Sequence, residues 1–251
     1  MTAKELAKFI DHSILHPTMT DADLEAGCQL AATYGTATVC IKPYAVPKAA
    51  ALLEGTGVAI CTVIGFPHGS NTTDLKVIET IEACRNGATE IDMVVNIGKV
   101  LEADWDYVEH EIDQIMHAAL EHNAILKVIF ENDYLEDSHK IKLCEICSKL
   151  HVAFVKTSTG YGFVKQPDGT FLTKGATLHD LRLMRAHCTP DIQIKAAGGI
   201  RNLKDMLAAI DAGATRIGAT ATAAIIGALN NDESDKGADN TENSSTEQGA
   251  Y

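Results

Sequence analysis

The sequence has no long apolar run and comparatively few positive charges. No stretch approaches the roughly 18 consecutive apolar residues of a membrane-spanning helix, and residues 1–9 contain no signal-peptide core. Lys and Arg number 21 against 34 Asp and Glu, which gives a formal net charge of −13. This charge disfavours nucleic acid and anionic membranes as partners, because both require a concentrated basic surface. We therefore expect a soluble, cytoplasmic protein that binds any phosphate group locally.

The pattern of cysteines does not suggest a disulfide framework. Their number, seven, is odd and they are scattered along the chain, which argues against a set of disulfides. Cys144 and Cys147 form a CxxC pair, but no second pair accompanies it and the segment has helical periodicity. We expect reduced, buried thiols, with a redox or metal role for the pair as the alternative.

Two motifs of cofactor chemistry are also missing. The ten histidines show no HxH or HExxH spacing, so the usual ligand arrangements of a zinc enzyme are absent. No glycine-rich dinucleotide fingerprint follows the first predicted strand. The sequence therefore predicts neither a metal nor an organic cofactor.

What the sequence does contain is a regular alternation of short β-branched runs with longer segments of helical period. This pattern is typical of repeated βα units around a parallel sheet. A length of 251 residues with 46% hydrophobic composition suits one (β/α)8 barrel. An open doubly wound sheet is the alternative, although it usually has fewer strands. The eight predicted strands are Ile10–Leu15, Thr36–Ile41, Val58–Gly65, Glu90–Asn96, Ile125–Glu131, Phe154–Thr159, Ile192–Ala197 and Arg216–Thr220.

Helix signals lie between these runs. Thr20 and the segment 71–74 are candidate N-caps. Glycines that can end a helix stand just before four strands, at positions 35, 57, 87 and 213. Three apolar stripes are expected to face the core: Trp105, Val108, Ile112, Ile115 and Ala119; Val77, Ile78, Ile81 and Cys84; and Leu143, Cys147 and Leu150.

The composition changes at Asn230. From there to Tyr251 the chain has six acids, one lysine and almost nothing apolar, so this segment supplies −5 of the net charge. Such a composition is typical of disorder. We expect one barrel domain over residues 1–229 and a flexible acidic tail over residues 230–251.

Four charged residues within the predicted strands are our candidates for the active site, which in a barrel forms at the C-terminal ends of the strands. They are Asp92, Lys127, Lys156 and Lys195. Each taken alone has a structural explanation, because a lysine can extend to solvent and an aspartate can cap a loop. Lys156 and Lys195, however, fall on neighbouring strands, and two ammonium groups about 6 Å apart at an effective dielectric of about 20 repel by roughly 2.8 kcal/mol. Such repulsion favours a neutral, nucleophilic amine, with Asp92 as a partner in proton transfer.

Small residues follow the last three strands. Residues 157–160, Gly198 with Gly199, and Gly218 would let backbone N–H groups approach a phosphate. Arg201 adds positive charge there. The loops after strands 7 and 8 are the common phosphate site of this fold. The alternative is that the glycines form ordinary turns.

These residues stand in segments that closely resemble the deoxyribose-phosphate aldolase family over about residues 8–228. The matching segments are residues 10–15 (IDHSIL), 65–73 (GFPHGSNTT), 86–96 (NGATEIDMVVN), 155–160 (VKTSTG) and 194–201 (IKAAGGIR). The resemblance implies a barrel enzyme that cleaves 2-deoxy-D-ribose 5-phosphate to D-glyceraldehyde 3-phosphate and acetaldehyde in deoxyribonucleotide catabolism.

The resemblance also implies roles for individual residues. Lys156 would form a Schiff base with the substrate aldehyde, Lys195 would be the second lysine and Asp92 the acidic partner. Tyr251 would match a terminal tyrosine that some relatives carry on a flexible tail, where its phenol could relay a proton to the reacting carbon. The implied phosphate and substrate residues are Gly160, Gly198, Gly199, Gly218, Thr220 and Cys40, although packing is the favoured role for Cys40.

The chain departs from the family pattern in places, and other functions stay open. His16 replaces a frequent lysine, Lys42 a frequent asparagine, and Thr220-Ala221 stands where serine is usual. A metal-dependent aldolase and a non-enzymatic phosphosugar-binding barrel are the alternative functions. Phosphosugar and aldehyde substrates are the expected partners. The sequence does not fix the oligomeric state, and a homodimer is one compatible assembly.

Overall fold

The computed structural model describes residues 1–229, and their centre is a closed barrel of eight parallel strands. The strands follow one another around the barrel in the order β1-β2-β3-β4-β5-β6-β9-β10. Each of the eight predicted runs contains one of them, so the predicted (β/α)8 fold is confirmed. Their bounds are β1 Ile10–Ile14, β2 Thr38–Ile41, β3 Ala59–Ile64, β4 Glu90–Val94, β5 Ile125–Ile129, β6 Phe154–Lys156, β9 Gln193–Ala197 and β10 Arg216–Ala219.

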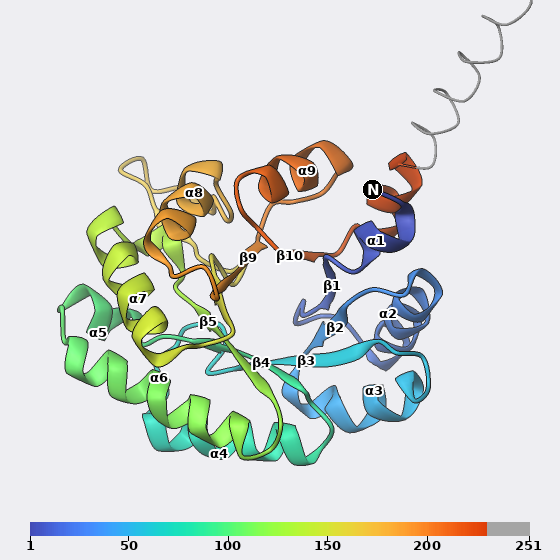
Figure 1. Cartoon of the computed structure of the whole chain (residues 1–251), viewed down its shortest axis with the longest axis horizontal. Coiled ribbons are helices and arrows are strands. Elements are labelled where there is room, and N and C mark those ends of the chain that lie inside the picture. Colours follow the sequence, from blue (N-terminus) through green and yellow to red (C-terminus); the bar gives the residue numbers. More distant parts are fainter. Residues whose placement is uncertain (230–251) are drawn as a thin grey trace, which may run out of the picture.

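Helices surround the barrel as an outer ring (Figure 1). A further helical stretch, residues 222–229, follows β10. Within residues 1–229, no helix is both long and apolar enough to cross a membrane. The ring and its short additions comprise α1 Ala3–Ala7, α2 Asp21–Tyr34, α3 Val46–Leu53, α4 Thr73–Arg85, α5 Ile97–Leu101, α6 Trp105–Leu120, α7 Asp137–Leu150, α8 Leu178–His187 and α9 Leu203–Asp211, with 3-10 turns at Pro43–Ala45 and Asn132–Tyr134.

The predicted capping residues lie at the ends of these helices. Thr20 accepts a hydrogen bond from the Asp23 amide at the start of α2, and Thr72 caps α4 in the same way. Gly35 ends α2 in the left-handed conformation, at a φ of 66°. A residue with a Cβ would be strained there, which explains why glycine marks the junction between helix and strand.

Two of the three predicted stripes pack against the core throughout, and the third does so only in part. On α6, Val108, Ile112, Ile115 and Ala119 are fully buried, as predicted. On α4, Val77 and Cys84 pack against the core, but the prediction was wrong for Ile78, which is 59% exposed, and the buried positions are Lys76, Thr80 and Ala83. The reason is an ion pair between α4 and α6, in which Lys76 Nζ lies 2.7 Å from Glu111 Oε1 with both side chains fully buried.

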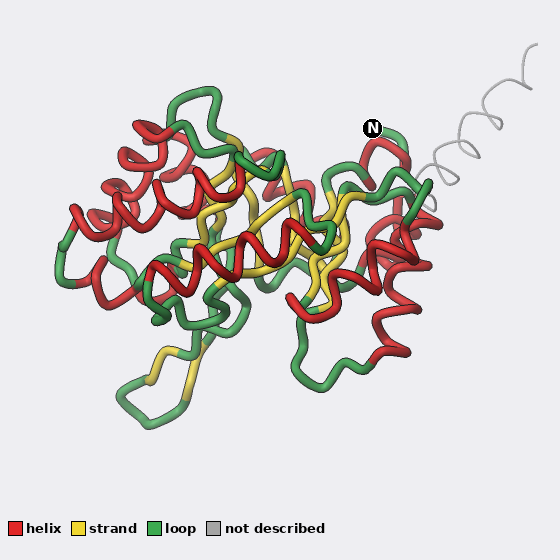
Figure 2. Tube along the Cα trace, turned by 90° about the horizontal axis from the view of Figure 1, so that it is seen from below, coloured by secondary structure: helices red, strands yellow, loops and turns green. Residues whose placement is uncertain are grey.

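A two-stranded hairpin interrupts the alternation after β6. Its strands, β7 (Val164–Lys165) and β8 (Phe171–Leu172), pair antiparallel outside the barrel. Figure 2 shows the hairpin projecting from the body of the molecule. This hairpin was not predicted, because its residues are mostly exposed and lack an apolar alternation.

The ion pair between α4 and α6 predicts a large effect of removing one partner. Lys76→Met leaves the Glu111 carboxylate buried without its cation, so the free energy of unfolding should fall by about 3 kcal/mol. Urea unfolding followed by circular dichroism measures it. Lys48→Met, at an exposed pair with Asp21, is the control and should unfold like the wild type. An unchanged midpoint for Lys76→Met would contradict the assignment of this pair to the core.

Candidate active site

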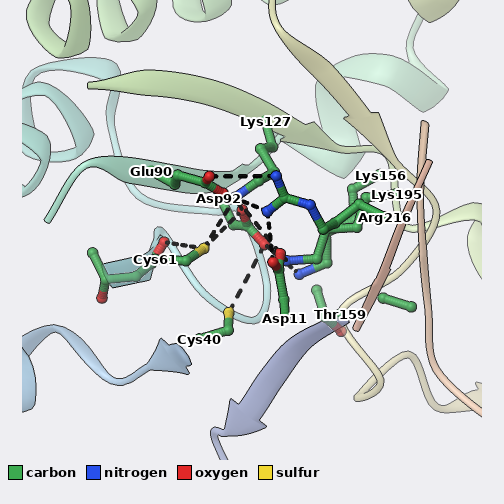
Figure 3. Close-up of polar contacts among 12 residues, drawn as sticks. Asp11, Cys40, Cys61, Glu90, Asp92, Lys127, Lys156, Thr159, Lys195 and Arg216 are labelled. Atoms are coloured by element: carbon green, nitrogen blue, oxygen red, sulfur yellow. Dashed lines mark hydrogen bonds and ion pairs between the residues drawn. The ribbon is translucent and has the colours of Figure 1, made fainter. Parts of the chain in front are cut away.

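The carboxylate of Asp92 lies at the centre of the barrel and contacts three lysines (Figure 3). Asp92 belongs to β4 and is fully buried. Its Oδ2 atom accepts hydrogen bonds from Lys156 Nζ and Lys195 Nζ, each at 2.8 Å. Its Oδ1 atom accepts one from Lys127 Nζ, also at 2.8 Å. One aspartate therefore joins three cations that come from three different strands.

The predicted lysine pair is adjacent in the structure. Lys156 is the last residue of β6 and stands directly opposite Lys195 of β9 in the strand register. Both are almost fully buried, at 2% and 1% exposure. The repulsion estimated from strand spacing alone omitted the carboxylates, since both amines share Asp92 and Lys195 also pairs with Asp11. The predicted proximity of Lys156 and Lys195 is thus confirmed, but the carboxylates of Asp92 and Asp11 offset the repulsion between the two lysines.

A second set of charges, absent from the sequence-based candidates, completes the network. Asp11 of β1 and Glu90 of β4 both pair with Arg216 of β10, at 2.6 and 2.9 Å. Glu90 also lies 2.6 Å from Lys127 Nζ. Opposite charges placed inside buried parallel strands are the sequence signal that could have identified these residues, because such charges must be paired.

The ion pairs determine the ionisation state of most residues in this network. Burial alone would raise the pKa of Asp92, but Lys127, Lys156 and Lys195 hold it well below its usual range. Burial would likewise lower the pKa of Lys195, but Asp11 and Asp92 hold it well above its ordinary value. The pKa of Lys127 is raised against burial, chiefly by Asp92. Asp92 is thus a carboxylate and the other two residues are ammonium ions.

Lys156 differs from the other two lysines in its partners. Among the described residues, the ion pairs of Lys195 involve two carboxylates and those of Lys127 three, whereas Lys156 contacts Asp92 alone. The network holds three carboxylates and, counting Arg216, four basic side chains. Lys156 is therefore the lysine of the network with the fewest anionic partners.

A cavity of about 320 Å³ opens above this network, at the C-terminal ends of the strands. Lys156 and Lys195 line it, but Lys127 does not. Lys127 is thus a structural cation beneath the cavity. The cavity walls include all seven predicted phosphate and substrate residues, which are Cys40, Gly160, Gly198, Gly199, Arg201, Gly218 and Thr220, and also His16.

The glycines on one side of the cavity bring backbone close to it. Gly198 and Gly199 have φ values of 90° and 84°, which L-residues with side chains rarely adopt. A Cβ on Gly218 would lie 3.5 Å from Lys195 Cε and 3.2 Å from Ala197 Cβ, so glycine leaves room for the lysine. The loops after β9 and β10 lead into helices at residues 203 and 222. Amide-rich loops before helix N-termini suit an anion.

Two cysteine thiols also lie close to Asp92. Cys40 of β2 and Cys61 of β3 are register partners, and Cys61 Sγ is 3.1 Å from Asp92 Oδ1. The contact with Cys61 and the nearby lysines lower the pKa of Cys40, whereas burial raises that of Cys61. Cys40, Cys61 and Asp92 are close enough together to hold a metal ion. Three ammonium groups around Asp92 oppose a divalent cation there, so the set fits thiol packing better.

A buried acidic residue that the sequence analysis missed holds the loop after Lys156. Glu131 follows β5 in a left-handed conformation, with a φ of 58°. Its carboxylate accepts hydrogen bonds from the Thr159 amide, at 3.3 Å, and from the Thr159 hydroxyl. Because Thr159 lines the cavity, Glu131 fixes one of its walls. A backbone strained at a non-glycine residue beside a site is consistent with such a positioning role.

The predicted site residue Tyr251 and the acidic segment 230–251 lie outside the described residues. Every other predicted site residue lies in the charge network or the cavity wall.

The network predicts how stability depends on pH. Asp92→Asn leaves three buried cations without their shared carboxylate and should lower the free energy of unfolding at pH 7 by at least about 3 kcal/mol. Because the folded pKa of Asp92 is depressed, its contribution is complete above the ordinary value of 3.8 and is lost as pH falls below it. The difference in the free energy of unfolding between wild type and variant, measured by urea unfolding, should therefore become smaller below about pH 4. A gap independent of pH would contradict the assigned ionisation.

Comparisons with known proteins agree with this geometry. Residues 6–230 match the family model described as DeoC/LacD family aldolase. A deoxyribose-phosphate aldolase of Rhodopirellula baltica is 50% identical over 223 residues, which cover 89% of this chain and 88% of that protein. One of Aciduliprofundum boonei is 46% identical, covering 91% and 99%. The tetrameric deoxyribose phosphate aldolase of Aeropyrum pernix superposes with a TM-score of 0.81 at 29% identity, covering 91% and 92%.

The family match spans nearly the whole barrel, including all the strands that supply the lysines and Asp92. The chain therefore belongs to the DeoC/LacD family of aldolases.

Proposed function

We propose that this protein is a 2-deoxy-D-ribose 5-phosphate aldolase that acts through a Schiff base on Lys156. The observation that carries the proposal is the position of Lys156. Its amine lies 2.8 Å from the Asp92 carboxylate, and the residue lines the same cavity as the glycine loops. The curated relatives of similar length carry this activity in their names. The seven free thiols fit a reducing cytoplasmic compartment, where deoxyribonucleotide catabolism takes place.

The substrate phosphate binds at the glycine side of the cavity. Backbone amides at Gly198, Gly199 and Gly218, the Thr220 hydroxyl and the Arg201 guanidinium supply donors there. Local donors suffice because a phosphate needs only a few charge-assisted hydrogen bonds. The phosphate fixes one end of the open-chain sugar, and the aldehyde carbon at the other end reaches Lys156.

The reaction begins when the neutral Lys156 amine attacks the C1 aldehyde and forms a carbinolamine. Lys195, an ammonium ion held by Asp11 and Asp92, donates the proton with which the carbinolamine hydroxyl leaves as water. The resulting iminium withdraws electrons from the C2–C3 bond. As this bond breaks, the C3 hydroxyl proton passes through a water to the Lys195 amine, which Asp92 holds by a hydrogen bond. Lys195 thereby regains the proton it donated, and D-glyceraldehyde 3-phosphate is released.

The enamine left on Lys156 is protonated at C2 and hydrolysed to acetaldehyde, which regenerates the free amine. Asp11 and Asp92 hold the pKa of Lys195 above its ordinary value against the effect of burial, so Lys195 is protonated at neutral pH and enters the reaction as a proton donor.

Substitution of Lys156 tests the proposal. Lys156→Ala and Lys156→Arg should both lower kcat for deoxyribose 5-phosphate cleavage by at least about a thousandfold, because guanidinium is not a usable nucleophile. A coupled assay for glyceraldehyde 3-phosphate measures the rate. Lys165→Ala, on the exposed hairpin, is the matched control and should cleave at the wild-type rate. Substantial turnover by Lys156→Arg would overturn the Schiff-base assignment.

The two alternative functions predict different results in the same assay. A metal-dependent aldolase would lose activity in EDTA, whereas the lysine mechanism keeps it. A phosphosugar-binding barrel would bind deoxyribose 5-phosphate without turnover.

We propose from the sequence resemblance that the Tyr251 phenol assists protonation of the enamine. Tyr251→Phe should then slow exchange of solvent deuterium into acetaldehyde, measured by NMR, about tenfold or more, while KM for deoxyribose 5-phosphate stays within about twofold. Deletion of Tyr251 should behave like Tyr251→Phe, because the hydroxyl carries the proton. Wild-type exchange in both variants would remove Tyr251 from the mechanism.

A further inference from the structure

The chain between β6 and α8 leaves the barrel and returns to it beside the reactive cavity. This stretch carries the hairpin of β7 and β8, which projects from the body of the molecule (Figure 2). We call residues 160–175 the hairpin segment. Its first residue, Gly160, lines the reactive cavity, and its last, Gly175, packs against Gly198 of the same cavity. The two ends of the segment, rather than its tip, therefore border the site.

One carboxylate holds the returning end of the hairpin segment. Asp133 lies in the 3-10 turn after β5 and is half-buried. Its Oδ2 atom accepts a hydrogen bond from the Lys174 amide at 2.8 Å, and its Oδ1 atom accepts one from the Gly175 amide at 3.1 Å. Hydrogen bonds from backbone amides to a carboxylate are of the stronger, charge-assisted kind. Asp133 therefore fixes the position at which the backbone returns to the barrel.

The returning backbone lies directly against Gly198. A Cβ added to Gly175 would lie 2.6 Å from the Gly198 carbonyl oxygen, which is closer than real Cβ atoms approach. The next residue, Ala176, donates its amide hydrogen to the same oxygen, at 3.1 Å. Both glycines have a positive φ, 67° at Gly175 and 90° at Gly198, a region that favours glycine. The position of one backbone thus determines the position of the other.

Gly198 belongs to the proposed phosphate site. Gly198 and Gly199 line the reactive cavity and supply amides to that site. A series of direct contacts therefore leads from Asp133, through Gly175, to these amides. Donors that are held in place before the phosphate arrives lose less conformational freedom on binding, so the rigidity of this loop contributes to affinity.

We propose that Asp133 is a positioning residue for the substrate phosphate. It holds the end of the hairpin segment against Gly198 and so keeps the amides of Gly198 and Gly199 directed at the phosphate. The proposal rests on the proposed aldolase function, since it concerns the phosphate end of the same substrate. The contact with the phosphate persists from the bound substrate through bond cleavage, so a loosened loop raises KM and leaves kcat nearly unchanged.

Asp133→Ala removes both hydrogen-bond acceptors. KM for deoxyribose 5-phosphate should rise about tenfold or more, as expected for the loss of hydrogen bonds to a charged group, while kcat stays within about threefold. For 2-deoxy-D-ribose, which has no phosphate, kcat/KM should stay within about twofold of the wild-type value. Asp133→Asn keeps one carbonyl oxygen that can accept and should give an intermediate KM. A merely structural role would instead lower activity with both substrates alike.

Asp168→Ala is the matched control on the same hairpin. Asp168 lies in the loop between β7 and β8, and its carboxylate also accepts a hydrogen bond from a backbone amide, that of Thr170 at 2.9 Å. This variant should keep KM for deoxyribose 5-phosphate within about twofold of the wild type, because the loop that it alters is not the end held against Gly198. Equal KM values in Asp133→Ala and Asp168→Ala would overturn the proposal, as would an equal loss of kcat/KM with the unphosphorylated sugar.

A pair of glycines tests the contact with Gly198 separately. Gly175→Ala places a methyl group against the Gly198 carbonyl and should raise KM for deoxyribose 5-phosphate at least as much as Asp133→Ala does. Gly169→Ala is the control for backbone strain, since Gly169 also has a positive φ, 86°, but an added Cβ would meet no atom of the described residues within 4 Å. Equal KM values in the two glycine variants would contradict the contact.

Failure of the proposed function is a distinguishable outcome. If the wild type does not cleave deoxyribose 5-phosphate, binding of inorganic phosphate, measured by phosphorus NMR, tests the role of Asp133 without any reaction. A dissociation constant about tenfold higher for Asp133→Ala than for Asp168→Ala would support the proposal. Equal constants, or a wild type that does not bind phosphate, would overturn it.

Discussion

The contact on which the rest of the site depends is that of the Asp92 carboxylate with three buried ammonium groups. Lysines cannot lie side by side in a barrel interior unless a carboxylate offsets their repulsion and the loss of water. Asp92 does this for Lys127, Lys156 and Lys195 at once. Without Asp92, the strand register that places Lys156 opposite Lys195 would leave the repulsion between the two cations without compensation.

The network divides the lysines by function. Lys127, beneath the cavity, neutralises the carboxylates and holds Asp92 in place. Lys195 stays charged because Asp11 supplies it with a second anion. Lys156, at the end of its strand, has the fewest anionic partners and borders the cavity. A single buried network thus holds the fully paired ammonium ion of Lys195 next to Lys156, which has one anionic partner.

The sequence predicted the barrel well, because βα alternation and glycines at helix ends are local signals. It failed on the buried face of α4, where Lys76 meets Glu111, because a buried ion pair looks like a solvated face until its partner is known. The hairpin of β7 and β8 was missed for a related reason, since it has no buried stripe of its own.

For the site, the sequence identified Asp92, Lys156 and Lys195 but not the other charged residues that pair with them. Lys156, Lys195 and Asp92 were recognisable because active sites of this fold lie at the C-terminal ends of strands. Asp11, Glu90 and Arg216 come together only when the barrel closes and brings β1 beside β10. Lys127 was a candidate whose structural role became clear only from its exclusion from the cavity. Charges inside the predicted strands could have marked these residues as candidates, but which charges pair is determined only by the closed barrel.

We propose that, of the three lysines that contact Asp92, Lys156 alone forms the covalent intermediate. Reduction with borohydride in the presence of acetaldehyde, followed by proteolysis and peptide mass mapping, identifies the lysine that reacts. We expect one ethyl adduct, 28 Da heavier than the unmodified peptide by the atoms that acetaldehyde and hydride add, on the peptide that contains Lys156. An adduct on Lys195 or Lys127 in its place would show that Lys156 is not the nucleophile.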